Sequence, residues 1–312
     1  MKDIFVNLKR FDVSRTLGGV CASDSPKLWI EWVLGECIGN GIGRLDGINV
    51  TFLLPEGLVI TAVDKLSGYD AVETGSIKIG CQGVYREDVA KGGNFGAFTT
   101  NRPSAAAKAL GCSCAIIGHS EERKDKLGIM AQYDPSVLVD GLAAQKARKA
   151  VDEIINREVL CALDRDIRVL VCVGETEEEK GGGSFDEQKS RIEAVLGAQL
   201  ETGLRGVKVK HRSDLVIGYE PVWAIGPGKV PPGKEYISFV SSRIKELACN
   251  VCGFKPDVVY GGGLKEENAG MIAEIDTLDG GLVALTRFSG EIGFYPDELK
   301  KIINKYISAD SL

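Results

Sequence analysis

The sequence has no surplus of basic charge, no long uncharged apolar run and no glycine loop after its first predicted strand. Lys and Arg number 38 against 44 Asp and Glu, a net charge of −6, which argues against a nucleic-acid partner because phosphate backbones are bound by excess cations. The amino-terminal MKDIFVNLKRFD has charges on both sides of a very short apolar segment, unlike an export signal or a membrane span. We therefore expect a cytoplasmic protein without a membrane partner.

The nine cysteines lack the spacing of a disulfide framework or a zinc site. An odd, irregularly spaced set in a chain without an export signal indicates reduced and mostly buried thiols. Cys249 and Cys252 form one CxxC, and Cys112 and Cys114 are near neighbours, but a zinc site of the usual kind needs a second matched pair. We expect packing roles for these residues and no metal or other cofactor, and the role of Cys249 and Cys252 stays open.

Short runs rich in β-branched and aromatic residues recur along the chain, and we expect each to be a strand. They are residues 3–9, 48–54, 77–82, 112–118, 167–174, 214–220, 257–262 and 281–286. Longer segments with helical spacing separate them. One follows Pro296, with apolar Leu299, Ile302, Ile303 and Tyr306, and another opens at Ser25-Pro26 and carries Leu28 and Trp32.

Near-continuous apolar strands indicate burial on both faces, which is typical of a parallel sheet covered by helices. Eight such units are enough to close a barrel. The rival open sheet has GxGxxG after its first strand, but the GNGIG at residues 39–43 ends a predicted helix and is interpreted as a C-cap and turn. We predict an α/β fold, a single (β/α)8 barrel domain over residues 1–312 with extended loops.

Four polar residues follow predicted strands: Asn7, Lys9, His119 and Glu220. Each alone has an ordinary interpretation, as a loop cap, a solvated cation, a structural histidine or a costly buried carboxylate. The carboxyl ends of barrel strands meet at one rim. Together the four supply a base, an electrophile and a fixed positive charge, the parts needed to move a proton next to a carbonyl. Lys9 and Asn7 would offset the charge of the enediolate intermediate.

His119 precedes the segment SEERK, so we expect Ser120 to cap a short helix whose positive end lies beside the imidazole. That end of a helix favours the neutral ring. A neutral imidazole donates a hydrogen bond to a substrate carbonyl without adding a second positive charge beside Lys9.

Five segments together resemble the triosephosphate isomerase family, in order along the chain. They are NLK at 7–9, IIGHSEERK at 116–124, VCVGET at 171–176, YEPVWAIGPGK at 219–229 and YGGGLKEENA at 260–269. The resemblance implies a homodimer that interconverts glyceraldehyde 3-phosphate and dihydroxyacetone phosphate in glycolysis and gluconeogenesis without a cofactor. It also implies a small phosphorylated sugar as the partner.

By this resemblance Glu220 shuttles the proton, His119 polarises the carbonyl, and Lys9 with Asn7 binds the substrate. Glu121 supports the site. Residues 221–229 form a lid that closes over the substrate, with the Gly226 amide reaching the phosphate.

The departures from the family lie mainly at the phosphate end. Gly263, which we expect to contribute to phosphate binding, stands where the family has a serine, and Ala284 and Leu285 replace a glycine pair. We expect Arg287 to take over as a phosphate ligand, since barrels commonly hold phosphate after strand eight. The alternative is a surface arginine paired with Glu291.

Two further departures leave the substrate and the assembly open. Gly83 replaces an active-site asparagine, which opens space near Lys9, and the loop that reaches a neighbouring subunit in the family is longer here. The first alternative function is therefore isomerisation of a four-carbon ketose phosphate of the erythrulose phosphate type. The second is a non-catalytic sugar-phosphate binder.

Overall fold

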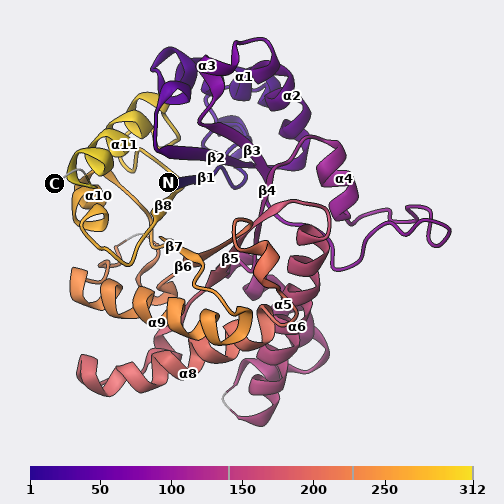
Figure 1. Ribbon diagram of the computed structural model, residues 1–312, viewed down its shortest axis with the longest axis vertical. Coiled ribbons are helices and arrows are strands. Elements are labelled where there is room, and N and C mark those ends of the chain that lie inside the picture. The colour runs from indigo at the N-terminus through magenta and orange to yellow at the C-terminus, as the bar shows by residue number, and fades with distance from the viewer. Residues whose placement is uncertain (140, 227, 311–312) are drawn as a thin grey trace. The chain divides into compact units, whose positions relative to one another are not determined.

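The structure is a computed structural model that describes residues 1–139, 141–226 and 228–310. Eight parallel strands close into a barrel in sequence order (Figure 1), so the predicted (β/α)8 barrel is confirmed. The strands are β1 (Lys2–Asn7), β2 (Ile48–Leu54), β3 (Ile77–Cys81), β4 (Cys114–Ile117), β5 (Arg168–Val173), β6 (Leu215–Tyr219), β7 (Asp257–Tyr260) and β8 (Gly280–Val283).

The strands are buried nearly throughout, as their apolar sequences predict. Every residue of β4, β6 and β8 is buried, and in-register parallel pairs such as Asn7 with Leu53 and Val173 with Tyr219 hold neighbouring strands together. Several predicted runs extend too far at the carboxyl end. β1 stops at Asn7 and β6 stops at Tyr219, so Lys9 and Glu220 lie in the loops that follow.

Helices follow the strands and place their apolar faces inward. They are α1 (Pro26–Gly39), α2 (Glu56–Ser67), α3 (Ala71–Thr74), α4 (Ser104–Ala109), α5 (Ser120–Tyr133), α6 (Leu142–Leu163), α7 (Glu177–Lys180), α8 (Phe185–Gly203), α9 (Lys234–Cys252), α10 (Glu266–Ala273) and α11 (Pro296–Asp310). Within the described ranges, no helix combines the length and the apolar character needed to span a bilayer.

Helix α1 begins as predicted but presents a different face to the core. The Ser25 hydroxyl accepts the Leu28 N–H at 3.3 Å and Pro26 takes the first helical position. Leu28 and Trp32 are 61% and 44% exposed, so the expected apolar pair is on the solvent side. The buried face is Trp29, Ile30, Val33, Leu34, Cys37 and Ile38. In α11 the predicted face, Leu299, Ile302, Ile303 and Tyr306, is buried.

The GNGIG segment forms the predicted cap and turn. Asn40 is the C-cap of α1, and Gly41 has φ 71°, a left-handed value that favours glycine. A short 3-10 turn, η2 (Ile42–Arg44), follows directly.

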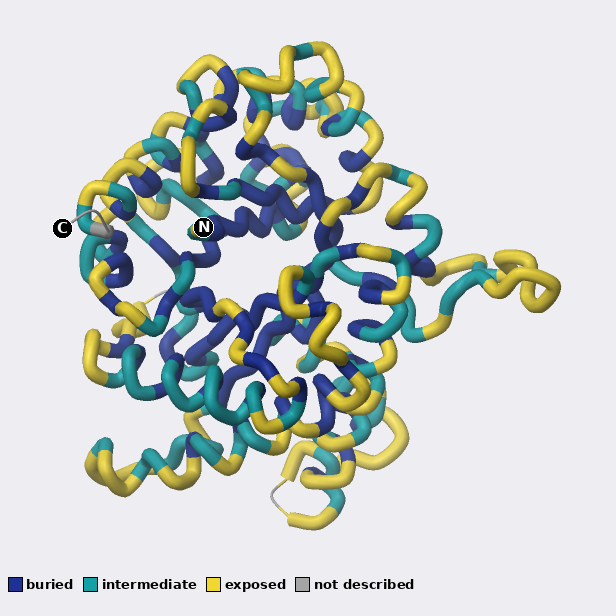
Figure 2. The backbone as a smooth tube through the Cα atoms, in the orientation of Figure 1, coloured by how far each residue is buried: buried dark blue, intermediate teal, exposed yellow. Residues whose placement is uncertain are grey.

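The chain divides into two compact units. One comprises residues 1–82, 107–115 and 259 onward, and the other comprises residues 83–106 and 116–258. In the first unit α10 packs on α11 and α1 on α2, and in the second α8 packs on α6 and α9 (Figure 1). In each unit the strands are buried and the outer helix faces are exposed (Figure 2). The single-domain assignment stays a prediction.

Candidate active site

His119 lies where β4 passes into α5. Gly118, with φ +76°, turns the chain, and His119 is itself the N-cap of the 14-residue α5. Our expectation that Ser120 caps a short helix is wrong, because the His119 ring takes that role. Its Nδ1 accepts the Glu121 N–H at 3.3 Å, and its Nε2 lies 3.1 Å from Glu220 Oε1. A nitrogen that accepts an N–H carries no proton of its own, so this geometry favours the neutral Nε2–H tautomer.

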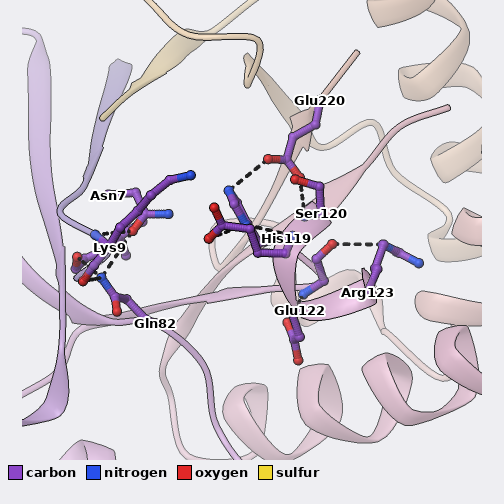
Figure 3. Close-up of polar contacts among 11 residues, drawn as sticks. Asn7, Lys9, Gln82, His119, Ser120, Glu122, Arg123 and Glu220 are labelled. Carbon is purple, nitrogen blue, oxygen red and sulfur yellow. Dashed lines mark hydrogen bonds and ion pairs between the residues drawn. The ribbon is translucent and has the colours of Figure 1, made fainter. Parts of the chain in front are cut away.

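Glu220 follows β6 and is 3% exposed. Its Oε2 accepts the Ser120 N–H at 2.9 Å, so the carboxylate rests on the amino end of α5 as well as on His119 (Figure 3). A Cβ on Gly174, just after β5, would lie 1.7 Å from the Glu220 carbonyl oxygen. Only glycine at 174 therefore allows the two strand ends to approach this closely.

Asn7, Lys9 and Gln82 form a separate polar cluster in the other unit. Asn7 Oδ1 accepts the Lys9 N–H at 3.0 Å, and Gln82 Nε2 donates to Asn7 Oδ1 at 3.2 Å and to the Lys9 carbonyl at 2.9 Å (Figure 3). Lys9 has φ 40°, a left-handed conformation that costs a non-glycine residue energy and is concentrated at functional sites. The cluster holds the lysine backbone in this conformation.

Gln82 was missing from the predicted site, although it is the last residue of the predicted strand 77–82; in the structure it directly follows β3. Its neighbour Gly83 has φ +139°, and a Cβ there would meet only the Ile116 carbonyl at 3.9 Å. The backbone conformation explains why glycine suits this position where the family has asparagine. Arg102 Nη2 donates to the Gly83 carbonyl at 2.7 Å and so fixes the turn.

Glu121, the predicted supporting residue, contacts His119 chiefly through its backbone. Its side chain is 64% exposed, with Oε2 3.8 Å from His119 Nδ1, beyond hydrogen-bond range. The backbone N–H is the donor that selects the histidine tautomer. A role for the Glu121 carboxylate stays a prediction.

The segment predicted to form a lid carries a short 3-10 turn, η5 (Val222–Ala224), whose Trp223 is anchored to the segment after β5. Glu175 is fully buried, and its Oε1 accepts from Trp223 Nε1 at 2.7 Å, Tyr236 OH at 2.8 Å and Tyr219 OH at 3.0 Å. Burial raises the pKa of Glu175, and the three donors oppose that rise. This anchor was not predicted, because its donors are far apart in the sequence.

Gly226, the predicted phosphate donor, has φ +122°, and residue 227 lies outside the described residues. Lys229 Nζ lies 3.3 Å from Glu177 Oε2, a second contact between the lid and the segment after β5. Both ends of the lid are thus tied to the same short segment.

Arg287 follows β8 in a small hairpin closed by hydrogen bonds with Gly293. Its Nε and Nη2 lie 2.7 and 2.6 Å from Glu298 Oε1, and its guanidinium lies 3.6 Å from the centre of the Tyr295 ring. The expected alternative pairing with Glu291 is wrong, since Glu291 lies 3.3 Å from Arg15 instead. Glu298 therefore neutralises the arginine.

Gly263 has φ +93°, and its carbonyl accepts from Asn268 Nδ2 at 3.0 Å. A left-handed φ of this kind favours glycine over the family's serine. The residues Ala284 and Leu285 directly follow β8.

No disulfide joins the cysteines within the described residues, and Cys249 and Cys252 lie at the end of α9. Burial, and then the neighbouring Cys249, raise the pKa of Cys252 to about 11, so this thiol is a poor nucleophile at neutral pH. In the part of the chain that the structure describes, no group of three or more His, Cys, Asp or Glu residues is arranged to hold a metal ion.

The closed barrel with polar residues after its strands defines the chain as a (β/α)8-barrel protein. The triosephosphate isomerase family pattern matches residues 50–304. The chain is 28% identical over 226 residues to triosephosphate isomerase of Chloroherpeton thalassium, covering 72% of this chain and 76% of that protein. It is 31% identical over 224 residues to that of Prochlorococcus marinus, covering 72% and 74%. This chain belongs to the triosephosphate isomerase family.

A solved structure gives the same fold. Triosephosphate isomerase from Bartonella henselae matches with a TM-score of 0.66 at 22% identity, covering 98% of this chain and 99% of that one. At this identity the likeness concerns the fold alone. The predicted family and barrel are confirmed.

Proposed function

We propose that this protein interconverts glyceraldehyde 3-phosphate and dihydroxyacetone phosphate. The observation that supports this most directly is the pairing of Glu220 Oε1 with His119 Nε2 at 3.1 Å, in which a buried carboxylate faces an imidazole whose other nitrogen accepts a backbone N–H. A base and a neutral hydrogen-bond donor are the two groups that proton transfer beside a carbonyl requires.

In the proposed reaction Glu220 removes a proton from the carbon next to the substrate carbonyl, and the His119 Nε2–H donates to the carbonyl oxygen. The electron pair of the broken C–H bond forms the enediolate. Glu220 then returns the proton to the neighbouring carbon, and the hydroxyl proton of the substrate passes by way of His119 to the former carbonyl oxygen, so the carbonyl group has moved and the enzyme is unchanged. We assign to Lys9 and Asn7 the stabilisation of the enediolate oxygen, since preorganised donors are usually the largest contribution in such reactions.

The proposed role of the lid is to exclude water from the reaction. Trp223, near the start of this segment, donates to Glu175, which also accepts from Tyr219 and Tyr236. Excluding water also protects the reactive enediolate from side reactions. We assign the Gly226 and Gly263 amides to the phosphate group.

The experiment that tests the proposed function is a coupled isomerase assay with three-carbon and four-carbon sugar phosphates side by side. The four-carbon alternative is motivated by Gly83, where a Cβ would meet only one atom, at 3.9 Å. A higher kcat/KM for the three-carbon pair supports our proposal, and the reverse order supports the alternative. Binding of sugar phosphates without exchange of carbon-bound hydrogen for solvent deuterium would establish a non-catalytic binder.

Arg287→Ala is expected to raise KM for the phosphorylated substrate by about 10-fold to 100-fold, because a charge-assisted hydrogen bond contributes about 1.5 to 3 kcal/mol. The prediction assigns phosphate binding to Arg287. Phosphate and the Glu298 carboxylate would then compete for the same guanidinium. Glu298→Gln is the matched control and should lower KM. Unchanged KM in Arg287→Ala would assign Arg287 to the hairpin alone.

We also propose a homodimer, in line with the family. Light scattering of the purified protein at micromolar concentration should give twice the mass of the 33.4 kDa chain. The long loop after β3 carries Phe95, 83% exposed, and is the expected contact. Phe95→Ser should shift the equilibrium toward the monomer, and a monomeric wild type would contradict the proposal.

A further inference from the structure

Three ionisable side chains with low exposure pack together behind His119, and the reaction above does not use them. Lys126 Nζ lies 2.5 Å from Glu122 Oε1 and 3.1 Å from Glu158 Oε1. Glu122 and Lys126 are one turn apart on α5, and Glu158 comes from the neighbouring α6. The side chains are 23%, 18% and 6% exposed, so solvent screens their charges only weakly.

This cluster is joined directly to the peptide that carries His119. Glu122 Oε2 accepts the Gly118 N–H at 2.6 Å (Figure 3). On the other side of the same residue, Arg123 Nε donates to the Gly118 carbonyl at 2.8 Å. Gly118 has φ +76°, and the first turn of α5 thus holds both of its polar backbone groups. His119 is the next residue along the chain, so these two hydrogen bonds act on the peptide directly before its ring.

The cluster has one cation for two carboxyl groups. Two buried carboxylates beside a single ammonium would leave one charge uncompensated, which is costly. Glu158 Oε2 is buried and has no hydrogen-bond partner within the described residues. A proton on Glu158 removes the excess charge and gives this oxygen a hydrogen to donate toward Glu122. The arrangement is therefore a carboxylic acid, a carboxylate and an ammonium.

The ionisation of the two carboxyls supports this arrangement. Burial, and then the adjacent Glu122, raise the pKa of Glu158 to about 9. Burial also acts to raise the pKa of Glu122, but the adjacent Glu158 and the charge of Lys126 outweigh it and lower that pKa. One proton is thus held in the cluster at neutral pH and lost in alkali.

The other ionisable groups around the cluster do not exchange this proton. Arg123 is paired with Asp152 at 2.6 Å. Burial raises the pKa of Cys161 to about 11 and that of Cys172 well above its ordinary value, so both thiols stay neutral. Burial also raises the pKa of Asp152, against the effect of Arg123.

We propose that Glu122, Lys126 and Glu158 form a positioning unit for His119 that works only while one proton is shared between the two carboxyls. When the proton leaves, the Glu158 carboxylate repels Glu122 and competes for Lys126. Glu122 then holds the Gly118 N–H less firmly, and the imidazole loses its alignment with Glu220. The kinetic consequence rests on the proposed isomerase function, whereas the effect on the His119 ring does not.

The first test replaces Glu122 and observes both kinetics and the imidazole. Glu122→Ala is expected to lower kcat about tenfold with KM nearly unchanged, because misplacement of a reacting group costs rate rather than binding. Glu122→Gln, whose amide oxygen still accepts from Gly118, should restore most of the rate. Glu187→Ala is the matched control, since that carboxylate also accepts a backbone N–H, from Ser184, at the start of α8.

The second readout is ¹⁵N NMR of the histidine rings. The chain has two histidines, so His211→Gln assigns both sets of signals. Glu122→Ala should shift the His119 nitrogen signals and leave those of His211 in place, and the control should shift neither. Unshifted His119 signals in Glu122→Ala would overturn the positioning unit, whatever reaction the protein catalyses. Absence of isomerase activity in the wild type would instead remove the proposed function alone.

The third readout is the alkaline limb of the activity profile. Wild-type kcat should fall as pH rises through about 9, the pKa of Glu158. In Glu158→Gln the limb should move to higher pH, because glutamine has no proton to lose. An identical limb in both proteins would overturn the shared-proton part of the proposal. This variant also serves if Glu122→Ala does not fold.

Discussion

Glu220→Gln is expected to lower kcat by about a thousandfold, because a positioned general base contributes about 10² to 10⁴ in rate. The amide keeps the shape of the carboxylate but cannot accept a proton. It also keeps an oxygen for the Ser120 N–H, which Glu220 Oε2 now accepts at 2.9 Å. We therefore expect KM to change by less than about threefold, as for an interaction made chiefly in the transition state.

The measurement is the coupled isomerase assay, accompanied by exchange of substrate hydrogen with deuterium. The isomerisation rate and the exchange rate should fall together in Glu220→Gln, since each requires the same proton transfer. Glu235→Gln is the matched control, because Glu235 is exposed in the first turn of α9, past the lid. A Glu220→Gln enzyme that kept a tenth or more of the wild-type kcat would exclude Glu220 as the base.

The strands were predictable because each carries a property that is local in the sequence. A run such as residues 214–219 is apolar on both faces, and only a covered parallel strand buries both. The predicted ends were less accurate at Lys9 and Glu220. Both residues lie in the loops after their strands. The pattern of apolar residues alone does not show where a strand ends and its loop begins.

The face of α1 could not be taken from two large apolar residues. Leu28 and Trp32 are four apart and fit one helix face, yet Trp29, Val33 and their neighbours form the buried one. Nearly every turn of this helix offers apolar residues on both sides. The packing against α2 selects between them, and that information is not local.

The candidate site divides in the same way. His119 and Glu220 were found because a histidine or a glutamate directly after an apolar strand is uncommon and therefore noticeable in the sequence. Glu175 was missed because its donors lie 44, 48 and 61 residues away. The partner of Arg287 was misassigned, since the helix that follows brings Glu298 closer than Glu291.

The Glu122, Lys126 and Glu158 cluster was missed for a similar reason. On α5 alone, Glu122 and Lys126 form an ordinary i,i+4 pair of the kind found on exposed helix faces. Only the packing of α6 adds Glu158 and turns a surface pattern into a buried site. The proton that this cluster binds should change the free energy of unfolding by a measurable amount.

Glu158→Gln is expected to stabilise the protein by about 3.5 kcal/mol at pH 7. The pKa of Glu158 is about 9 when folded, against an ordinary value of 4.5. Between these values the folded chain keeps a proton that the unfolded chain releases, so the free energy of unfolding of the wild type decreases as pH rises. At pH 7 about 2.5 pH units of this window have been crossed, at about 1.4 kcal/mol each. Glutamine has no proton to release, so the free energy of unfolding of the variant does not decrease in this way. Its amide can also donate a hydrogen bond toward Glu122.

Urea unfolding at pH 5, 7 and 8.5 measures the difference between Glu158→Gln and the wild type. The advantage of the variant should be smallest, below about 1 kcal/mol, at pH 5, which lies only about 0.5 pH unit above the ordinary pKa of 4.5, and it should grow with pH. Glu201→Gln, on the exposed face of α8, removes a carboxyl without touching the cluster and should show no such trend. A stability difference that does not vary with pH would mean that Glu158 is ionised in the folded protein.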